Sequence, residues 1–250
     1  SSEIKKHGSN AQLVTYYSGK SYLELRKKRF VTSDQCLHDA NQSRTYSKED
    51  SYEATVSLLD HAFVLLFYGA IDEAIEEMTQ ALEKVREMSE TTIQLRCLTY
   101  LTVAYRYKGD RAQTKGFALN SIELAEKCDL KAYIAAGKSN LGWYFLTSGD
   151  VIQAKPLLQE AQIIWKALED TYHYPFQWLG LLPLIEINLS EGNIEQAKTY
   201  SQTLLDDRLA ALPADVTQVL QALSEGDVQV NDALKTLRVF SHNNDFLLIQ

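Results

Sequence analysis

The chain has 250 residues, of which 45% are hydrophobic and 23% are charged, an ordinary globular composition with enough length for a sizeable core. Acidic residues outnumber basic residues by eight, so the surface as a whole lacks the positive charge that a nucleic-acid groove requires. Four prolines and 11 glycines are too few for a long disordered linker or a turn-rich β protein, and no apolar run is long enough to span a bilayer.

The first 50 residues differ from the rest of the chain. Apolar residues between Tyr16 and Val31 are sufficient for one or two helices, and the polar stretch over 43–50 is typical of a loop. We expect residues 1–50 to form either a degenerate helical hairpin that caps the fold or the end of a preceding domain. The opening residues form no signal peptide and lack an initiator methionine, so we interpret the sequence as part of a longer protein.

A short basic run, Arg26–Arg29, lies within this region. It could contact nucleic acid, an acidic membrane or an adjoining domain. The run has only four residues and no aromatic interleaving beyond Phe30, which favours a solvated helix face or a domain contact.

The next predicted helix, over Val56–Tyr68, is apolar on every side, which is typical of a buried helix. Left open, it would expose an apolar patch of a size that soluble monomers rarely tolerate. We therefore expect residues 11–31 to fold as helix against Val56–Tyr68. A second copy of the chain is the alternative cover.

From this helix onward, one unit recurs along the chain. Four segments with the same pattern begin at Gly69, Gly109, Gly149 and Gly192, separated by 40, 40 and 43 residues, and a weaker copy begins at Gly226, 34 residues later. Each glycine follows helical periodicity and can take the left-handed conformation that ends a helix. Asp or Asn follows the glycine in three of the four clear copies and is a good N-cap for the next helix. Each unit is therefore predicted to consist of a helix, a tight turn and a second helix.

The third copy carries the fullest pattern, with a small residue where the two helices approach closely; its members are Leu141, Gly142, Phe145, Gly149, Asp150, Ala154, Leu158 and Ala161. This pattern resembles the tetratricopeptide signature, and the period near 40 resembles the longer-helix version of that repeat. That version occurs in sensor domains of large bacterial transcription activators, in C-terminal arms of multidomain signalling ATPases and cyclases, and in peptide-sensing regulators.

The resemblance covers roughly residues 52–240 and implies an all-α fold, a right-handed α-α superhelix with a concave binding surface. It specifies the scaffold and not the ligand. We therefore divide the chain into residues 1–50, a helical cap or the end of a preceding domain, and residues 51–250, a repeat domain of about four to five hairpins.

In this family the groove is lined mostly by the first helix of each repeat. Carried onto this sequence, those positions and their neighbours are Arg96, Thr99, Tyr100, Val103, Arg106 and Tyr107 in the second repeat, Ala136, Ser139, Asn140, Trp143 and Thr147 in the third, and Glu186, Ser190 and the nearby Trp178 in the fourth. Aromatic residues together with arginine are typical of recognition hot spots. The alternative is that side chains such as Trp143 and Tyr107 only fill space between helices.

Two further expectations follow from the groove assignment. Because a groove residue contacts the ligand more than the core, Arg106→Ala and Trp143→Ala are expected to weaken binding and leave stability nearly intact. The carboxylate clamp of some tetratricopeptide domains uses Lys and Asn at positions that Thr99, Val103, Ser139 and Trp143 occupy here, so that function is not expected. If residues 11–31 cover the first repeat, as expected above, the ligand should bind in the second to fourth repeats.

No catalytic or metal-binding motif is present in the sequence. The five histidines, at 7, 38, 61, 173 and 242, do not fall at metal-ligand spacing, and His61 among apolar neighbours is expected to be a satisfied core histidine. Acidic neighbours such as Glu76 and Glu77 point from separate helix faces and are expected on the solvated surface. The three cysteines at 36, 97 and 128 form no C-x-x-C motif, which favours buried thiols in a reducing compartment over disulfides or zinc.

These observations favour a non-catalytic binding module of a larger cytoplasmic regulator, with no cofactor and no metal. The expected partner is a protein, a peptide or upstream domains of the same chain, and self-association is open. Neither nucleic acid nor a membrane is expected to bind this region. The alternative function is a receptor domain for a small molecule, such as a sugar, in a transcription regulator.

Overall fold

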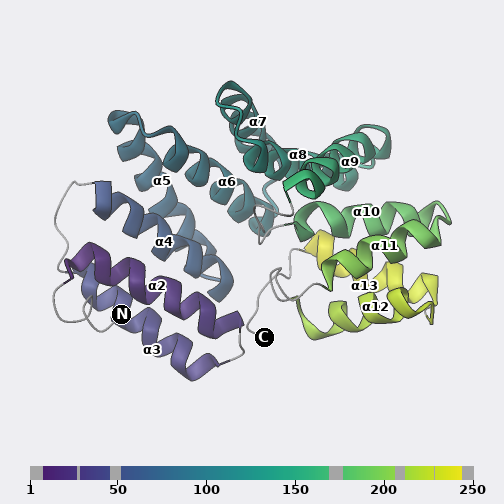
Figure 1. Cartoon of the computed structure of the whole chain (residues 1–250), viewed down its shortest axis with the longest axis horizontal. Coiled ribbons are helices and arrows are strands. Elements are labelled where there is room, and N and C mark those ends of the chain that lie inside the picture. Colours follow the sequence, from purple (N-terminus) through teal and green to yellow (C-terminus); the bar gives the residue numbers. More distant parts are fainter. Residues whose placement is uncertain are drawn as a thin grey trace. The chain divides into compact units, whose positions relative to one another are not determined.

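The computed structural model describes residues 8–26, 29–45, 52–168, 177–205, 212–227 and 229–243. All regular structure in these ranges is α-helical, which confirms the predicted fold class, an all-α superhelix of hairpins. In chain order (Figure 1) the helices are α2 (Asn10–Arg26), α3 (Phe30–Thr45), α4 (Tyr52–Tyr68), α5 (Ile71–Met88), α6 (Thr91–Lys108), α7 (Arg111–Lys127), α8 (Lys131–Thr147), α9 (Val151–Leu168), α10 (Trp178–Ser190), α11 (Ile194–Leu204), α12 (Ala214–Glu225) and α13 (Val230–Asn243).

The chain folds as two compact units, and the boundary between them falls between Ala104 and Tyr105, inside α6. The first unit contains α2 to α5 and most of α6. The second contains the last turn of α6 and the helices from α7 to α13. None of the described helices combines the length and hydrophobicity needed to cross a membrane.

In the first unit, α2 packs on both α3 and α4, and α4 packs on α5. The ring of Tyr22 on α2 contacts Phe63 and Phe67 on α4, with ring centroids 5.1 and 4.9 Å apart. The prediction that the N-terminal segment covers the apolar α4 helix is therefore confirmed for α2. The segment predicted to cover α4 ended at Val31, but in the structure Val31 belongs to α3 and is exposed.

Two buried serines join α2 to α3. The Ser21 hydroxyl donates to the Ser33 carbonyl over 2.9 Å, and the Ser33 hydroxyl donates to the Ser21 carbonyl over 2.8 Å. The Tyr68 hydroxyl, at the end of α4, contacts both serine hydroxyls. Small side chains let the helices approach closely, and their reciprocal bonds satisfy polar groups that are buried there.

The glycine turns between helices form as predicted. The five repeat glycines all have positive φ, between 73° and 81°. Asp110 and Asp150 cap the following helices, because each carboxylate accepts a 3.0 Å hydrogen bond from the backbone N–H three residues later. The expected cap at Asn193 does not form, since its side-chain amide donates to Glu191 instead.

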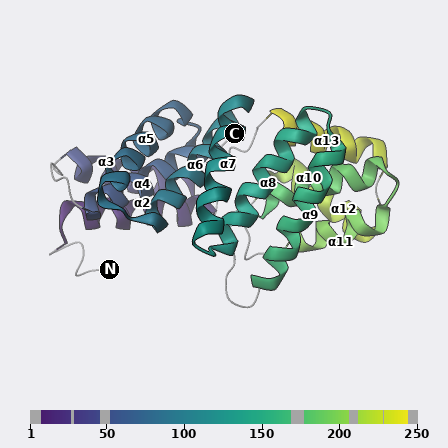
Figure 2. The ribbon, with the colours of Figure 1, turned by 90° about the horizontal axis from the view of Figure 1, so that it is seen from above.

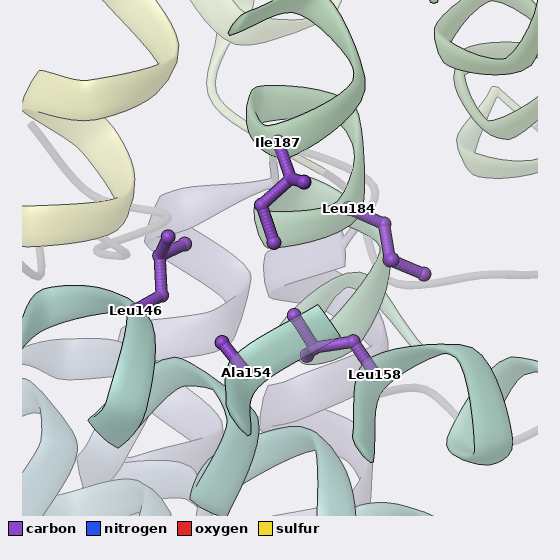
Figure 3. Close-up of a cluster of buried hydrophobic side chains, with 5 residues drawn as sticks. All are labelled: Leu146, Ala154, Leu158, Leu184 and Ile187. Atoms are coloured by element: carbon purple, nitrogen blue, oxygen red, sulfur yellow. The ribbon is translucent and has the colours of Figure 1, made fainter. Parts of the chain in front are cut away.

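The core of the second unit lies where α8, α9 and α10 meet. α8 and α9 are packed neighbours (Figure 2), and α10 packs on both. Buried aliphatic side chains from the three helices meet in one cluster (Figure 3), formed by Leu146, Ala154, Leu158, Leu184 and Ile187. Gly142 permits this approach, because a Cβ there would lie 2.6 Å from Leu158 Cγ.

Two glycine substitutions should therefore have opposite effects on stability. Gly142→Ala is expected to destabilise the protein by about 1–3 kcal/mol, because the new methyl overpacks the Leu158 contact. Gly116→Ala, in the middle of α7 with open space around the added Cβ, is expected to stabilise it by about 0.5–1 kcal/mol. Urea unfolding of both variants checks this, and a Gly142→Ala protein as stable as Gly116→Ala would contradict the packing.

The last hairpin is arranged differently from the earlier ones. In two earlier pairs of hairpins, the first helix of one lies beside the first helix of the next, since α4 lies beside α2 and α10 beside α8. In the last hairpin it is the second helix, α13, that contacts α10, while α12 contacts α11 (Figure 1). This reversal places α13 against the part of α10 that was predicted to line a groove.

Candidate functional site

The predicted groove residues are divided between the two compact units. Of the fourteen predicted positions, four belong to the first unit, namely Arg96, Thr99, Tyr100 and Val103, and the other ten belong to the second. Arg106, Asn140, Trp143 and Trp178 meet in one cluster, here called the Arg106 cluster. Tyr107 follows Arg106 in the sequence and is half-buried. Glu186 contacts α13.

In the first unit, Arg96 on α6 forms an ion pair with Asp60 on α4, with 2.6 Å between Nη2 and Oδ1. The two side chains are 23% and 21% exposed. The guanidinium carbon lies 5.6 Å from the centroid of the Tyr100 ring, which in turn lies 4.8 Å from the Phe63 ring. These four residues, here called the Arg96 cluster, combine charge and aromatic surface at a partly open position.

Asp60 was missed as a member of this site. The signal for it was present, because Asp60 is the only carboxylate between Glu53 and Asp72 in an otherwise apolar segment. A charge in such a segment has to be exposed or paired. Only the structure shows that its partner is Arg96, 36 residues further along the chain.

The Arg106 cluster is closed to solvent. Arg106 Nη1 donates to Asn140 Oδ1 over 3.1 Å and to the Leu179 carbonyl over 3.0 Å, so one side chain from α6 joins α8 and α10. Its guanidinium carbon lies 4.8 Å from the Trp143 ring centroid and 6.0 Å from that of Trp178. Arg106 is 0% exposed, and this burial lowers its pKa well below the ordinary value.

This burial corrects one of the expectations drawn from the sequence. Trp143 is 2% exposed, and Asn140 and Trp178 are similarly enclosed. Replacing Trp143 or Arg106 by alanine cannot leave stability nearly intact, because each would leave a cavity in packed surroundings. Whether the cluster also contacts a ligand stays a prediction.

In the fourth repeat, the predicted groove positions contact the chain itself. Arg238 on α13 donates from Nε to Glu186 Oε1 over 3.1 Å and from Nη2 to the Ser190 hydroxyl over 3.2 Å. Glu186 is buried in this contact, while Arg238 is half-exposed. Sequence reasoning missed Arg238, because it lies in the weakest copy of the repeat, where no register could be assigned.

His61 is buried, as predicted, and one of its ring nitrogens makes a hydrogen bond. Its Nδ1 lies 2.7 Å from Glu77 Oε2 on α5. Glu77 was expected on the solvated surface, and this expectation is wrong, since the carboxylate is buried against the imidazole. The neighbouring Glu76 is exposed, so the two acidic side chains do point from separate faces, as predicted.

The cysteines are only partly as expected. Cys36 and Cys97 are buried, and burial raises the pKa of Cys97 to about 12, which disfavours the reactive thiolate. Cys128 is exposed, against the expectation of a buried thiol. Among the described residues, no group of three or more His, Cys, Asp or Glu side chains is placed to hold a metal ion.

No protein-family model matches the sequence, and no curated protein sequence matches it either. Among solved structures, the chain is similar to a Rap protein complexed with competence and sporulation factor, at 15% identity and a TM-score of 0.68, over 98% of this chain and 68% of that one. It is similar to aspartyl phosphate phosphatase F from Bacillus subtilis, at 12% identity and a TM-score of 0.62, over 96% of this chain and 59% of that one. It is also similar to BtubC from P. vanneervenii, at 16% identity and a TM-score of 0.58, over 88% and 84% of the two chains. At these identities the likeness shows a common all-α fold.

Proposed function

We propose that the chain is a non-catalytic binding module of a larger cytoplasmic regulatory protein and that it holds a protein or peptide partner on the first helices of its hairpins. The observation that carries this proposal is the partly open Arg96 cluster, in which an arginine and two aromatic rings share one face of α4 and α6. The proposal is also supported by the Rap protein of similar fold, which was solved in a complex with a factor.

The Arg96 cluster has the chemistry of a recognition hot spot. Arginine and tyrosine are enriched at such positions, because they combine apolar contact area with directional hydrogen bonds. Asp60 holds the guanidinium in place, so little conformational freedom remains to be lost when a partner binds. A carboxylate or backbone carbonyl of the partner can bind the remaining guanidinium donors, while an apolar side chain packs on Tyr100 and Phe63.

The buried residues have a different role in this proposal. The Arg106 cluster is closed, so its residues support the packing of α6, α8 and α10 rather than making the first contact with a partner. Among the fourteen positions predicted from the sequence to line the groove, Arg96 and Tyr100 are therefore the two whose replacement should affect binding most directly.

Selection of random peptides displayed on phage, followed by calorimetric titration of the enriched peptides, tests the proposal. We expect Arg96→Ala and Tyr100→Ala to weaken binding at least about tenfold, as hot-spot truncations do. Arg96→Ala should cost about 1–3 kcal/mol in stability, because its ion pair is mostly buried and Asp60 loses its partner, so the variant is expected to remain folded while its binding is measured.

The matched control is Arg86→Ala, which removes an exposed arginine from the last turn of α5. This variant should bind the selected peptides as the unaltered chain does. Peptides that bind all three variants equally well, or a selection that enriches none, would contradict the proposal.

A further inference from the structure

A separate pocket lies between α9 and α11 in the second unit, with a volume of about 280 Å³. Its wall on α9 includes Gln162 and Trp165, and its wall on α11 includes Gln196 and Tyr200. Gln177, in the turn before α10, completes the lining. None of these residues belongs to the Arg96 or Arg106 cluster.

Three glutamine amides in this lining are available for a ligand. Within the described part of the chain, the side-chain amides of Gln162, Gln177 and Gln196 make no hydrogen bonds. Gln177 is only 6% exposed. Gln162 is half-buried and Gln196 is exposed, so all three amides remain able to donate and accept hydrogen bonds with a molecule in the pocket.

The rest of the lining is polar but nearly uncharged. The hydroxyls of Thr199 and Thr203 donate to backbone carbonyls one turn earlier, over 3.0 and 3.2 Å, and keep their lone pairs for a ligand donor. Lys166 is the only charged residue among the described lining, and it is exposed. An anionic ligand would require a stronger positive site, usually with arginine.

Aromatic surface accompanies these polar groups. Trp165 is buried in the pocket wall, and Tyr200 packs against the aliphatic cluster of α8, α9 and α10. The Tyr200 hydroxyl is protonated at neutral pH, as in any ordinary tyrosine, and can donate as well as accept; burial raises its pKa further. Aromatic rings beside groups that both donate and accept hydrogen bonds match a molecule with C–H faces and hydroxyl edges.

We propose that this pocket binds a free neutral sugar of one or two rings through the three glutamine amides, the threonine and tyrosine hydroxyls and the aromatic wall. The volume is just below the roughly 300–1,000 Å³ of drug-sized ligand sites, which excludes a folded partner or a long peptide. The site is independent of the proposed partner-binding face, and it assigns a small-molecule ligand to the same chain.

Saturation-transfer difference NMR on the full chain tests the proposal, with glucose, galactose, N-acetylglucosamine and maltose as probes at millimolar concentration. At least one sugar is expected to receive saturation and to change tryptophan fluorescence on titration. Gln162→Ala and Gln196→Ala, on opposite walls, should each bind that sugar about tenfold more weakly, the effect of losing a well-formed hydrogen bond. Neither residue is fully buried, so both variants should fold normally.

Matched controls come from the same helices. Gln159→Ala on α9 and Gln202→Ala on α11 remove exposed glutamines that do not line the pocket, and both should bind sugar normally. Arg96→Ala should also leave sugar binding unchanged, which separates this test from that of the partner site. No binding of any probe, binding by both pocket variants as tight as that of the unaltered chain, or binding of inorganic phosphate in place of sugar would overturn the proposal.

Discussion

Replacing Trp143 by alanine is expected to lower the free energy of unfolding by about 3–5 kcal/mol, the usual cost of truncating a buried tryptophan. The ring is 2% exposed and stacks on the guanidinium of Arg106 at 4.8 Å. Its removal would leave a cavity and would also take away a surface that holds Arg106 against α8 and α10. Urea unfolding followed by circular dichroism measures the loss.

Two further variants make this result specific. Trp143→Phe keeps an aromatic face against Arg106 and should lose clearly less stability than Trp143→Ala. Ile152→Ala, at an 88% exposed position on α9, should change stability by no more than about 0.5 kcal/mol. A loss below about 1 kcal/mol for Trp143→Ala would show that the ring is not packed as described.

The second large effect is expected when α2 and α3 are removed. Deleting residues 1–45 would uncover the face of α4 on which Tyr22 contacts Phe63 and Phe67, and it would remove the serine bonds to Tyr68. A contiguous apolar face of this kind promotes association. Light scattering coupled to gel filtration should show dimers or aggregates, and an apolar dye should bind strongly.

Deleting only residues 1–8, which precede α2, is the control and should leave the chain monomeric and unable to bind the dye. If the longer deletion also behaves this way, other helices of the first unit already cover α4. The capping role of α2 would then be disproved.

Features of the fold that depend on local chemistry could be predicted from the sequence. A left-handed turn needs a residue such as Gly149, and a helix start favours a short acceptor such as Asp150, so the two neighbours mark a hairpin without knowledge of the rest of the chain. Asn193 shows the limit of this reasoning. Its amide found a different partner, Glu191, two residues away, and the predicted cap was lost.

The candidate site could be predicted less well, because its contacts are long-range. Arg106 donates to residues 34 and 73 positions away, and Arg238 reaches Glu186 over 52 positions. The tetratricopeptide-like pattern marks the residues that pack between the two helices of a hairpin, and so it also indicates which positions do not pack there. Whether such positions stay open depends on how closely α6, α8 and α10 approach one another, which the spacing of the repeats does not encode.

The reversed last hairpin has a consequence for cooperativity. In an ideal repeat array, stability is a sum over neighbouring units, and each terminal unit can unravel with little effect on the others. Here α13 bypasses α11 to contact α10, and Arg238 fixes it to Glu186 and Ser190. Loss of α13 would therefore expose a helix of the preceding hairpin as well. The helices from α10 to α13 should exchange their amide hydrogens as one block, without the graded fraying expected at the end of a regular array.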